Sequence, residues 1–193
     1  DDWVKELKTE NYLHNHTIMW FASIWIFTLN LPWELGARFF MKHLFDGDAA
    51  SNTLSWRWVA GIQTQGKNYL ARESNIRKFT NQRYTNTSLN ENALPLENPK
   101  IYPLQEVRHL HTKQKYKDLV LFETDLNVKE RYSFFENYDN IYLVLLDNKN
   151  RNIKLDEKVL NFKRTLQEAF VSEISNSQIC LLYTSDAADD NVG

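Results

Sequence analysis

The sequence predicts a mainly α-helical protein that is followed by a small α/β unit. Within segment 12–29, apolar residues lie on all sides past Met19, as in a helix buried within a helical core. After residue 118, apolar runs of strand length alternate with amphipathic segments, which is typical of an α/β unit. We therefore expect a helical domain over residues 1–84, a linker or loop over 85–110 and an α/β unit over 111–178.

Three successive helices are expected in the helical domain. The first covers Tyr12–Leu29, and the second runs from Pro32 to about Phe45, since proline suits the first turn of a helix. Gly47 then allows a tight turn, and Asp48 can cap a third helix that ends near Gly61.

The rest of the chain divides into a polar part, the α/β unit and a tail. Segment 85–103 holds three of the four prolines, which predicts a loop. Beyond it we expect strands at 119–122 and 141–146 and helices at 128–137 and 156–173. The final segment, 179–193, resembles the translation of a sequencing adapter, so we expect a cloning-derived tail there.

The composition is that of an ordinary globular protein, with 25% charged and 42% hydrophobic residues and a net charge of −2. The single cysteine, Cys180, lies in the expected tail, which argues against disulfides and cysteine metal sites. The chain opens without a signal peptide, and its most apolar run, Ile18–Leu31, is shorter than a bilayer span. The expected protein is cytoplasmic and monomeric, has no membrane segment and, because it starts at Asp1, is a fragment of a larger protein.

Positive charge is concentrated between Arg57 and Arg83, where six basic residues and one acidic residue give a local balance of +5. Such a run is compatible with binding along a phosphate backbone. The alternative is a solvated basic loop, and charge alone favours that alternative.

The stretch 46–58 combines two carboxylates, three hydroxyls, one amide and two indoles. Asn52 follows Asp48 by one helical turn, so both side chains can face one ligand, and they suit a heterocycle with N–H and C=O edges. Plain helix capping by the aspartates is the alternative. A calcium loop is excluded, because Arg57 occupies the twelfth position, where such a loop needs Glu.

Trp56 and Trp58 lie two residues apart, which is about 200° around a helix. They are therefore expected to face different ways, one toward a cofactor and the other toward a cavity. Ordinary core packing is the alternative for both indoles.

Upstream, Asn15 and Met19 are spaced at i,i+4 and share a helix face. His14 and His16 flank Asn15, and on a helix their rings would point apart. No shared metal site is therefore expected, and the sequence predicts no metal elsewhere.

Together these residues resemble the flavin domain of the DNA photolyase/cryptochrome family. The resemblance covers roughly residues 12–61, with a weaker echo at Tyr69…Arg72-x-x-Asn75. The matching motifs are His14-Asn15-x-x-x-Met19, Trp33-x-x-Gly36, Phe40, Asp46-Gly47-Asp48-x-x-Ser51-Asn52 and Trp56-x-Trp58.

The resemblance implies an all-α domain with a U-shaped FAD at its centre and assigns roles to matched positions. The residues expected at the cofactor are Asn15, Asp46, Asp48, Ser51 and Asn52. Electron transfer would use Trp56 as the inner carrier and Trp33 as the middle carrier. The cavity for the damaged bases would be lined by Asn15, Met19 and Trp58.

The resemblance further implies a deoxyribodipyrimidine photo-lyase that repairs cyclobutane pyrimidine dimers in damaged DNA, with an antenna chromophore in a preceding segment. The alternative is a cryptochrome-like photoreceptor or electron-transfer flavoprotein without repair activity. That alternative is motivated by Ile18 and His16, which stand where repair enzymes usually carry Arg, and by the absence of the family's usual ending after Phe79. A third possibility is a helical binding module without flavin.

Overall fold

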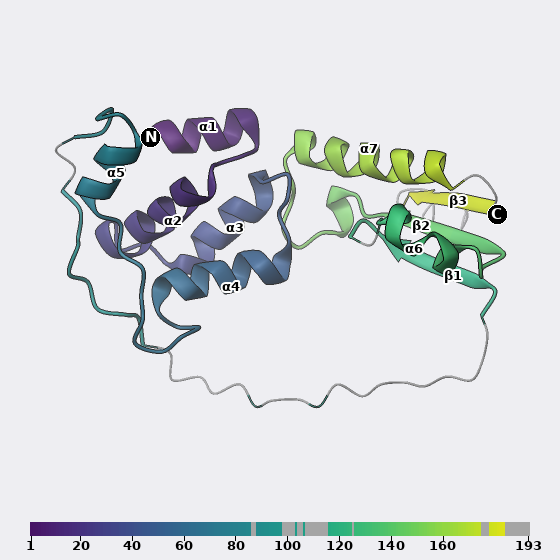
Figure 1. Cartoon of the computed structure of the whole chain (residues 1–193), viewed down its shortest axis with the longest axis horizontal. Helices are drawn as coiled ribbons and strands as arrows, with labels where there is room; N and C mark the ends of the chain where they lie inside the picture. Colours follow the sequence, from purple (N-terminus) through teal and green to yellow (C-terminus); the bar gives the residue numbers. More distant parts are fainter. Residues whose placement is uncertain are drawn as a thin grey trace. The chain divides into compact units, whose positions relative to one another are not determined.

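The computed structural model describes residues 1–85, 88–97, 103, 106, 116–124 and 126–174, together with the backbone of residues 178–183. The chain forms two compact units, Asp1–Tyr102 and Pro103–Gly193. The first is helical and the second contains a parallel sheet (Figure 1), which confirms the predicted fold class. The division falls within the expected linker 85–110, much of which lies outside the described residues.

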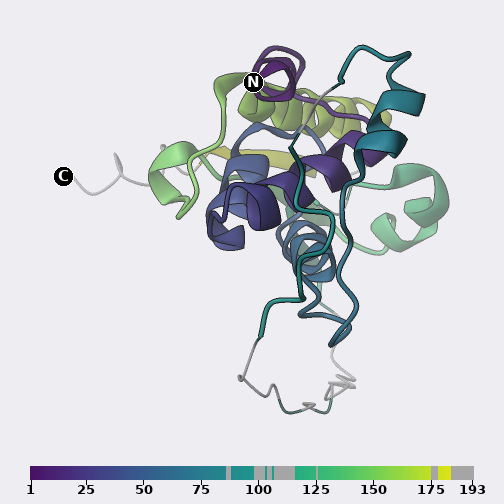
Figure 2. The same ribbon diagram turned by 90° about the vertical axis from the view of Figure 1, so that its left-hand side faces the viewer.

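Unit 1 is built from short helices, of which α2, α3 and α4 pack side by side (Figures 1 and 2). The predicted helix 12–29 is present as α2 and a following π-helix, but it begins three residues later than expected. The two unpredicted helices are α1 and α5. The elements are α1 (Asp2–Glu10), α2 (Asn15–Ser23), the π-helix η1 (Ile24–Thr28), α3 (Trp33–His43), α4 (Ala49–Ala60) and α5 (Glu73–Phe79).

Helix α4 ends where the sequence predicts. Gly61 follows it with φ 78°, in the left-handed region that favours glycine, and its N–H donates to the Arg57 and Trp58 carbonyls. This local bonding satisfies carbonyls that the helix end would otherwise leave open.

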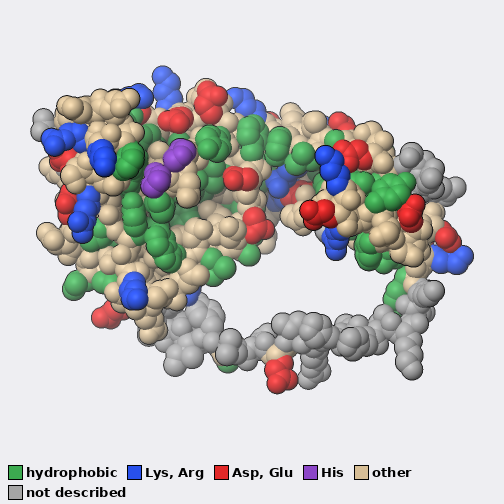
Figure 3. Space-filling model, in the orientation of Figure 1, with side chains coloured by type: hydrophobic (Ala, Val, Ile, Leu, Met, Phe, Trp, Pro, Cys, Tyr) green, Lys and Arg blue, Asp and Glu red, His purple; other side chains and the backbone are tan. Residues whose placement is uncertain are grey.

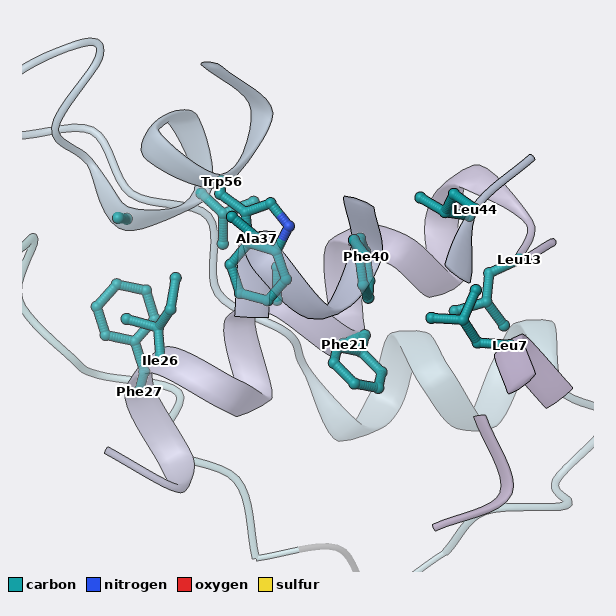
Figure 4. Close-up of a cluster of buried hydrophobic side chains, with 12 residues drawn as sticks. Leu7, Leu13, Phe21, Ile26, Phe27, Ala37, Phe40, Leu44 and Trp56 are labelled. Atoms are coloured by element: carbon teal, nitrogen blue, oxygen red, sulfur yellow. The ribbon is translucent and has the colours of Figure 1, made fainter. Parts of the chain in front are cut away.

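The core of unit 1 centres on Trp56, which projects from α4 against α3 (Figure 4). Its ring meets Phe40 edge-on, with centroids 5.0 Å apart, and only 1% of the residue is exposed. A Cβ at Gly36 would lie 2.1 Å from Cη2 of Trp56. The two helices can therefore approach this closely only because position 36 carries no side chain.

Unit 2 is a βαβαβ unit whose three strands are parallel and ordered β1-β2-β3. The predicted alternation of strands and helices is present. The elements are β1 (Asp118–Phe122), α6 (Val128–Phe135), β2 (Asn140–Leu145), the 3₁₀-helix η2 (Asn148–Asn150), α7 (Glu157–Glu173) and β3 (Gln178–Tyr183).

The strand β3 includes residues 179–183, which the sequence interpretation left out of the fold. These residues pair in register with β2, so that Leu143 lies opposite Leu181. The run Ile-Cys-Leu-Leu-Tyr is apolar enough for a strand of a parallel sheet, whatever its origin. Residues 184–193 of the expected tail lie outside the described residues.

A buried charge cluster joins the end of β1 to α7. Glu123 binds the guanidinium of Arg151 through both carboxylate oxygens and lies 3.4 Å from Nζ of Lys163. All three side chains are about nine-tenths buried. The carboxylate thus offsets two cations that would be costly to bury alone.

In the described part of the chain, no helix is both long and apolar enough to cross a bilayer.

Replacing Gly36 with Ala should destabilise unit 1 by about 1–3 kcal/mol, because the added methyl group overpacks the contact with Trp56. All six tryptophans lie within residues 3–58, so tryptophan fluorescence during urea unfolding reports on unit 1 alone. Leu35→Ala on the same helix, at a side chain that is 54% exposed, is the control and should change the midpoint little. A Gly36→Ala midpoint at or above the wild-type value would contradict this account.

Candidate functional site

A hollow of about 550 Å³ lies on unit 1, bordered by α2 and α4. Its lining combines apolar side chains with amides and hydroxyls, and it contains no charged residue. Residues predicted from the sequence make up part of this lining. Those predicted residues are Asn15, Met19, Ser51, Trp56 and Trp58.

The two indoles of α4 face different ways, as their spacing predicts. Trp56 is buried, whereas Trp58 is 40% exposed. Trp56 lines the hollow, and its Nε1–H has no hydrogen-bond partner among the described residues. That nitrogen is itself buried, so Trp56 offers the hollow part of its ring rather than a hydrogen-bond donor.

Trp58 offers an exposed aromatic surface at the hollow. Its ring stacks on Tyr69, with centroids 5.7 Å apart and an interplanar angle of 26°. Burial raises the pKa of the Tyr69 hydroxyl above its ordinary value, so the side chain stays neutral beside the indole. The stack holds Trp58 in place while part of the indole remains open to a planar ligand.

The polar side chains around the start of α4 already make hydrogen bonds within unit 1. Oδ1 of Asp48 accepts the Ser51 N–H at 2.7 Å and caps the helix. Nδ2 of Asn52 donates to the Ala37 carbonyl at 2.7 Å and thereby ties α4 to α3. Asp46 is exposed in the turn before α4. Asp46, Asp48 and Asn52 are not among the residues that line the hollow, and their expected role at a cofactor stays a prediction.

The predicted electron carriers differ in their surroundings. Trp33 is half-buried, and the Arg57 guanidinium lies 5.9 Å from the centroid of its ring. The indole in contact with Trp56 is instead that of Trp25, whose centroid is 6.3 Å away in an edge-on arrangement. Sequence reasoning missed Trp25, because apolar residues on all sides of this segment single out no one face.

Of the two departures from the expected arginines, only Ile18 lies at the hollow. Its side chain is half-buried and packs against the main core of unit 1. The hollow therefore has a neutral wall at the place where the resemblance would put a cation.

The expectation that His14 and His16 point apart is wrong. His14 is the N-cap of α2 with an extended backbone, and its Nδ1 accepts the His16 N–H at 3.3 Å. The helical angle between the two residues therefore does not apply, and the rings stack with centroids 5.6 Å apart.

A second hollow of about 390 Å³ lies beside Trp3 and Trp25 and contains none of the predicted site residues. The hollow between α2 and α4 is therefore the candidate site.

The family model for the FAD binding domain of DNA photolyase matches residues 1–118. No solved structure matches the chain.

Several curated relatives are named deoxyribodipyrimidine photo-lyase. The one from Streptomyces griseus is 38% identical over 89 residues, covering 40% of this chain and 20% of the relative. The one from Buchnera aphidicola is 28% identical over 134 residues, covering 60% and 28%. The one from Escherichia coli is 35% identical over 69 residues, covering 36% and 15%. The chain thus spans well under a third of the length of these relatives.

Substitutions at Asp48 test its role as the cap of α4. Asp48→Ala should lower the stability of unit 1 by about 1 kcal/mol, because the Ser51 N–H loses its acceptor. Asp48→Asn should stay close to the wild type, since asparagine caps equally well without a charge. Urea unfolding followed by tryptophan fluorescence measures both, and equal losses in the two variants would show that the cap is not the stabilising interaction.

Proposed function

The chain belongs to the family of the FAD-binding domain of DNA photolyase, and we propose that it is part of a flavoenzyme that repairs cyclobutane pyrimidine dimers in DNA under light. The observation that carries the proposal is the shared hollow of Asn15, Met19, Trp56 and Trp58. These are the positions to which the resemblance assigns the damaged bases and the inner electron carrier.

The chemistry of the hollow suits FAD. The isoalloxazine ring is planar and apolar on its faces and carries acceptors and one N–H at its edge. The hollow offers apolar walls, the Ser51 hydroxyl and the Asn15 amide. When bound and reduced, FAD supplies under light the electron that splits the cyclobutane ring, and the same electron returns afterwards.

The chain's own residues would hold the damaged bases. An extruded pyrimidine pair costs a few kcal/mol of unstacking, and stacking on the exposed indole of Trp58 offsets part of that cost. Asn15 can both donate to and accept from the edge of a base, and Met19 supplies an adaptable apolar contact.

Electron supply to the cofactor would run through indoles, with Trp56 as the inner carrier and Trp33 as the next. Trp25 is a further candidate for the second position, because its ring contacts Trp56. The cation beside Trp33 disfavours a positive hole there by electrostatic repulsion, whereas Trp25 donates its N–H to the Pro32 carbonyl at 2.9 Å.

The alternative function is a cryptochrome-like photoreceptor or electron-transfer flavoprotein without repair. Ile18 favours it, because it gives the hollow an apolar wall where a cation would help to hold an anionic reduced cofactor. This alternative requires the same cofactor and the same Trp56, but it requires no binding of damaged DNA.

The full-length parent protein should bind dimer-containing DNA more tightly than undamaged DNA and should restore it under blue light. Trp58→Ala should weaken dimer binding about tenfold, within the range for loss of one base stack. The matched control is Leu54→Ala, which changes an exposed apolar residue of the same hollow without removing a ring. A parent that holds FAD and leaves dimers intact in light would reject repair and favour the alternative.

Photoreduction of the parent's flavin should be largely lost in Trp56→Phe. Comparing Trp33→Phe with Trp25→Phe by transient absorption then identifies the second carrier, since the variant lacking it should lose the long-lived separated charge. Unchanged photoreduction in Trp56→Phe would exclude an indole relay that starts at this residue.

A further inference from the structure

Three aromatic rings form a continuous stack on the surface of unit 1, outside the hollow. The ring of His16 stacks on His14 with centroids 5.6 Å apart, and on Phe79 with centroids 5.9 Å apart and planes only 5° from parallel. We call these three residues the aromatic platform. They come from two places in the sequence, the start of α2 and the end of α5.

The aromatic platform is exposed to solvent, including the apolar ring of Phe79. Phe79 is 59% exposed, and both histidines are exposed as well. A single exposed apolar residue needs no explanation, but aligned rings from separate helices provide a flat, ordered surface. Figure 3 shows exposed histidine side chains beside hydrophobic surface, with Lys and Arg side chains nearby.

Buried contacts beneath the platform hold its two halves together. Trp20 is buried, and the centroid of its ring lies 6.0 Å from that of His16. Its Nε1–H donates to Oδ1 of Asn75 at 3.1 Å. Ile76, also on α5, packs into the same buried cluster as Trp20. Since α5 is fixed to α2 in this way, Phe79 is ordered against His16 before any partner binds, which lowers the entropic cost of binding.

The charge around the platform is positive. Nζ of Lys78 lies 5.3 Å from the centroid of the Phe79 ring, and Arg77 precedes it in the last turn of α5. Both belong to the segment from Arg57 to Arg83, which carries a net charge of +5. A partner that combines flat rings with regularly spaced negative charge fits this surface, and a single DNA strand has both.

The platform also borders the candidate site. Asn15 lies between His14 and His16 in the sequence and lines the hollow, so the first turn of α2 connects the two surfaces. We propose that the aromatic platform stacks an unpaired base of the DNA strand that flanks the hollow, while Lys78 contacts the backbone phosphate of the same strand. This proposal extends the proposed function, in which a neighbouring pair of adjacent pyrimidines is extruded from the same strand.

The test uses this chain, in the dark and without flavin, with a fluorescent undamaged thymidine 12-mer and a 12-mer of the same backbone without bases. Fluorescence anisotropy should show tighter binding of the thymidine strand. Phe79→Leu and His16→Ala should each weaken that binding about fivefold to tenfold, as expected for loss of a base stack, and should leave binding of the baseless strand unchanged. Lys78→Gln should weaken binding of both strands. It should also make the negative slope of log affinity against log salt concentration shallower by about 0.7.

Phe134→Leu is the matched control. Phe134 belongs to unit 2, is 38% exposed and has the Arg131 guanidinium 5.3 Å from its ring centroid, so it resembles Phe79 beside Lys78. Its replacement should leave DNA binding unchanged. Tryptophan fluorescence should be the same in wild type and Phe79→Leu, which shows that unit 1 stays folded.

Equal affinity of the wild type for the two strands would overturn the proposal, as would wild-type binding by Phe79→Leu or no binding of either strand. The proposed function is judged separately, because dimer selectivity and repair by the parent are absent from this measurement. If the aromatic platform binds undamaged strands and the parent protein does not repair dimers, the proposed function fails while the stacking role of the platform is supported.

Discussion

The contact between Trp56 and Gly36 is the constraint on which the rest of unit 1 depends. The indole fills the space that a side chain at position 36 would need, so α3 and α4 lie close together. Asn52 reinforces the same junction through its hydrogen bond to the Ala37 carbonyl. With Trp56 fixed inward, the helical geometry turns Trp58 outward, which gives the hollow one buried and one exposed indole.

This arrangement explains why the hollow is suited to a planar ligand. It also explains why a function without repair fits the same hollow. Its lining is neutral and partly aromatic. The basic residues of segment 57–83 lie outside the lining of the hollow, and one of them, Lys78, lies beside Phe79 of the aromatic platform. Recognition of a heterocycle and attraction of a phosphate backbone are therefore separate properties of separate surfaces.

The sequence predicts the fold where local signals are strong. Asp48 and Gly61 mark the two ends of α4, and the 200° between Trp56 and Trp58 predicts their opposite burial. Helices α1 and α5 escape prediction because they are short, nine and seven residues, and each fully buries a single residue, Leu7 or Ile76.

The candidate site can be predicted only in part from the sequence. The resemblance to the photolyase/cryptochrome family points to Asn15, Met19, Ser51, Trp56 and Trp58, which the structure brings to one hollow. Residue types and spacings cannot show that Asp48 and Asn52 already bond to the backbone, that the extended N-cap His14 stacks on His16, or that Trp25 contacts Trp56. Each of these depends on backbone geometry that local patterns do not encode.

A crystal structure of the full-length parent protein with its cofactor tests the central claim most directly. The account predicts an isoalloxazine ring in the hollow between α2 and α4, in contact with Trp56. A flavin bound away from Trp56, or a hollow filled by other protein side chains, would contradict it.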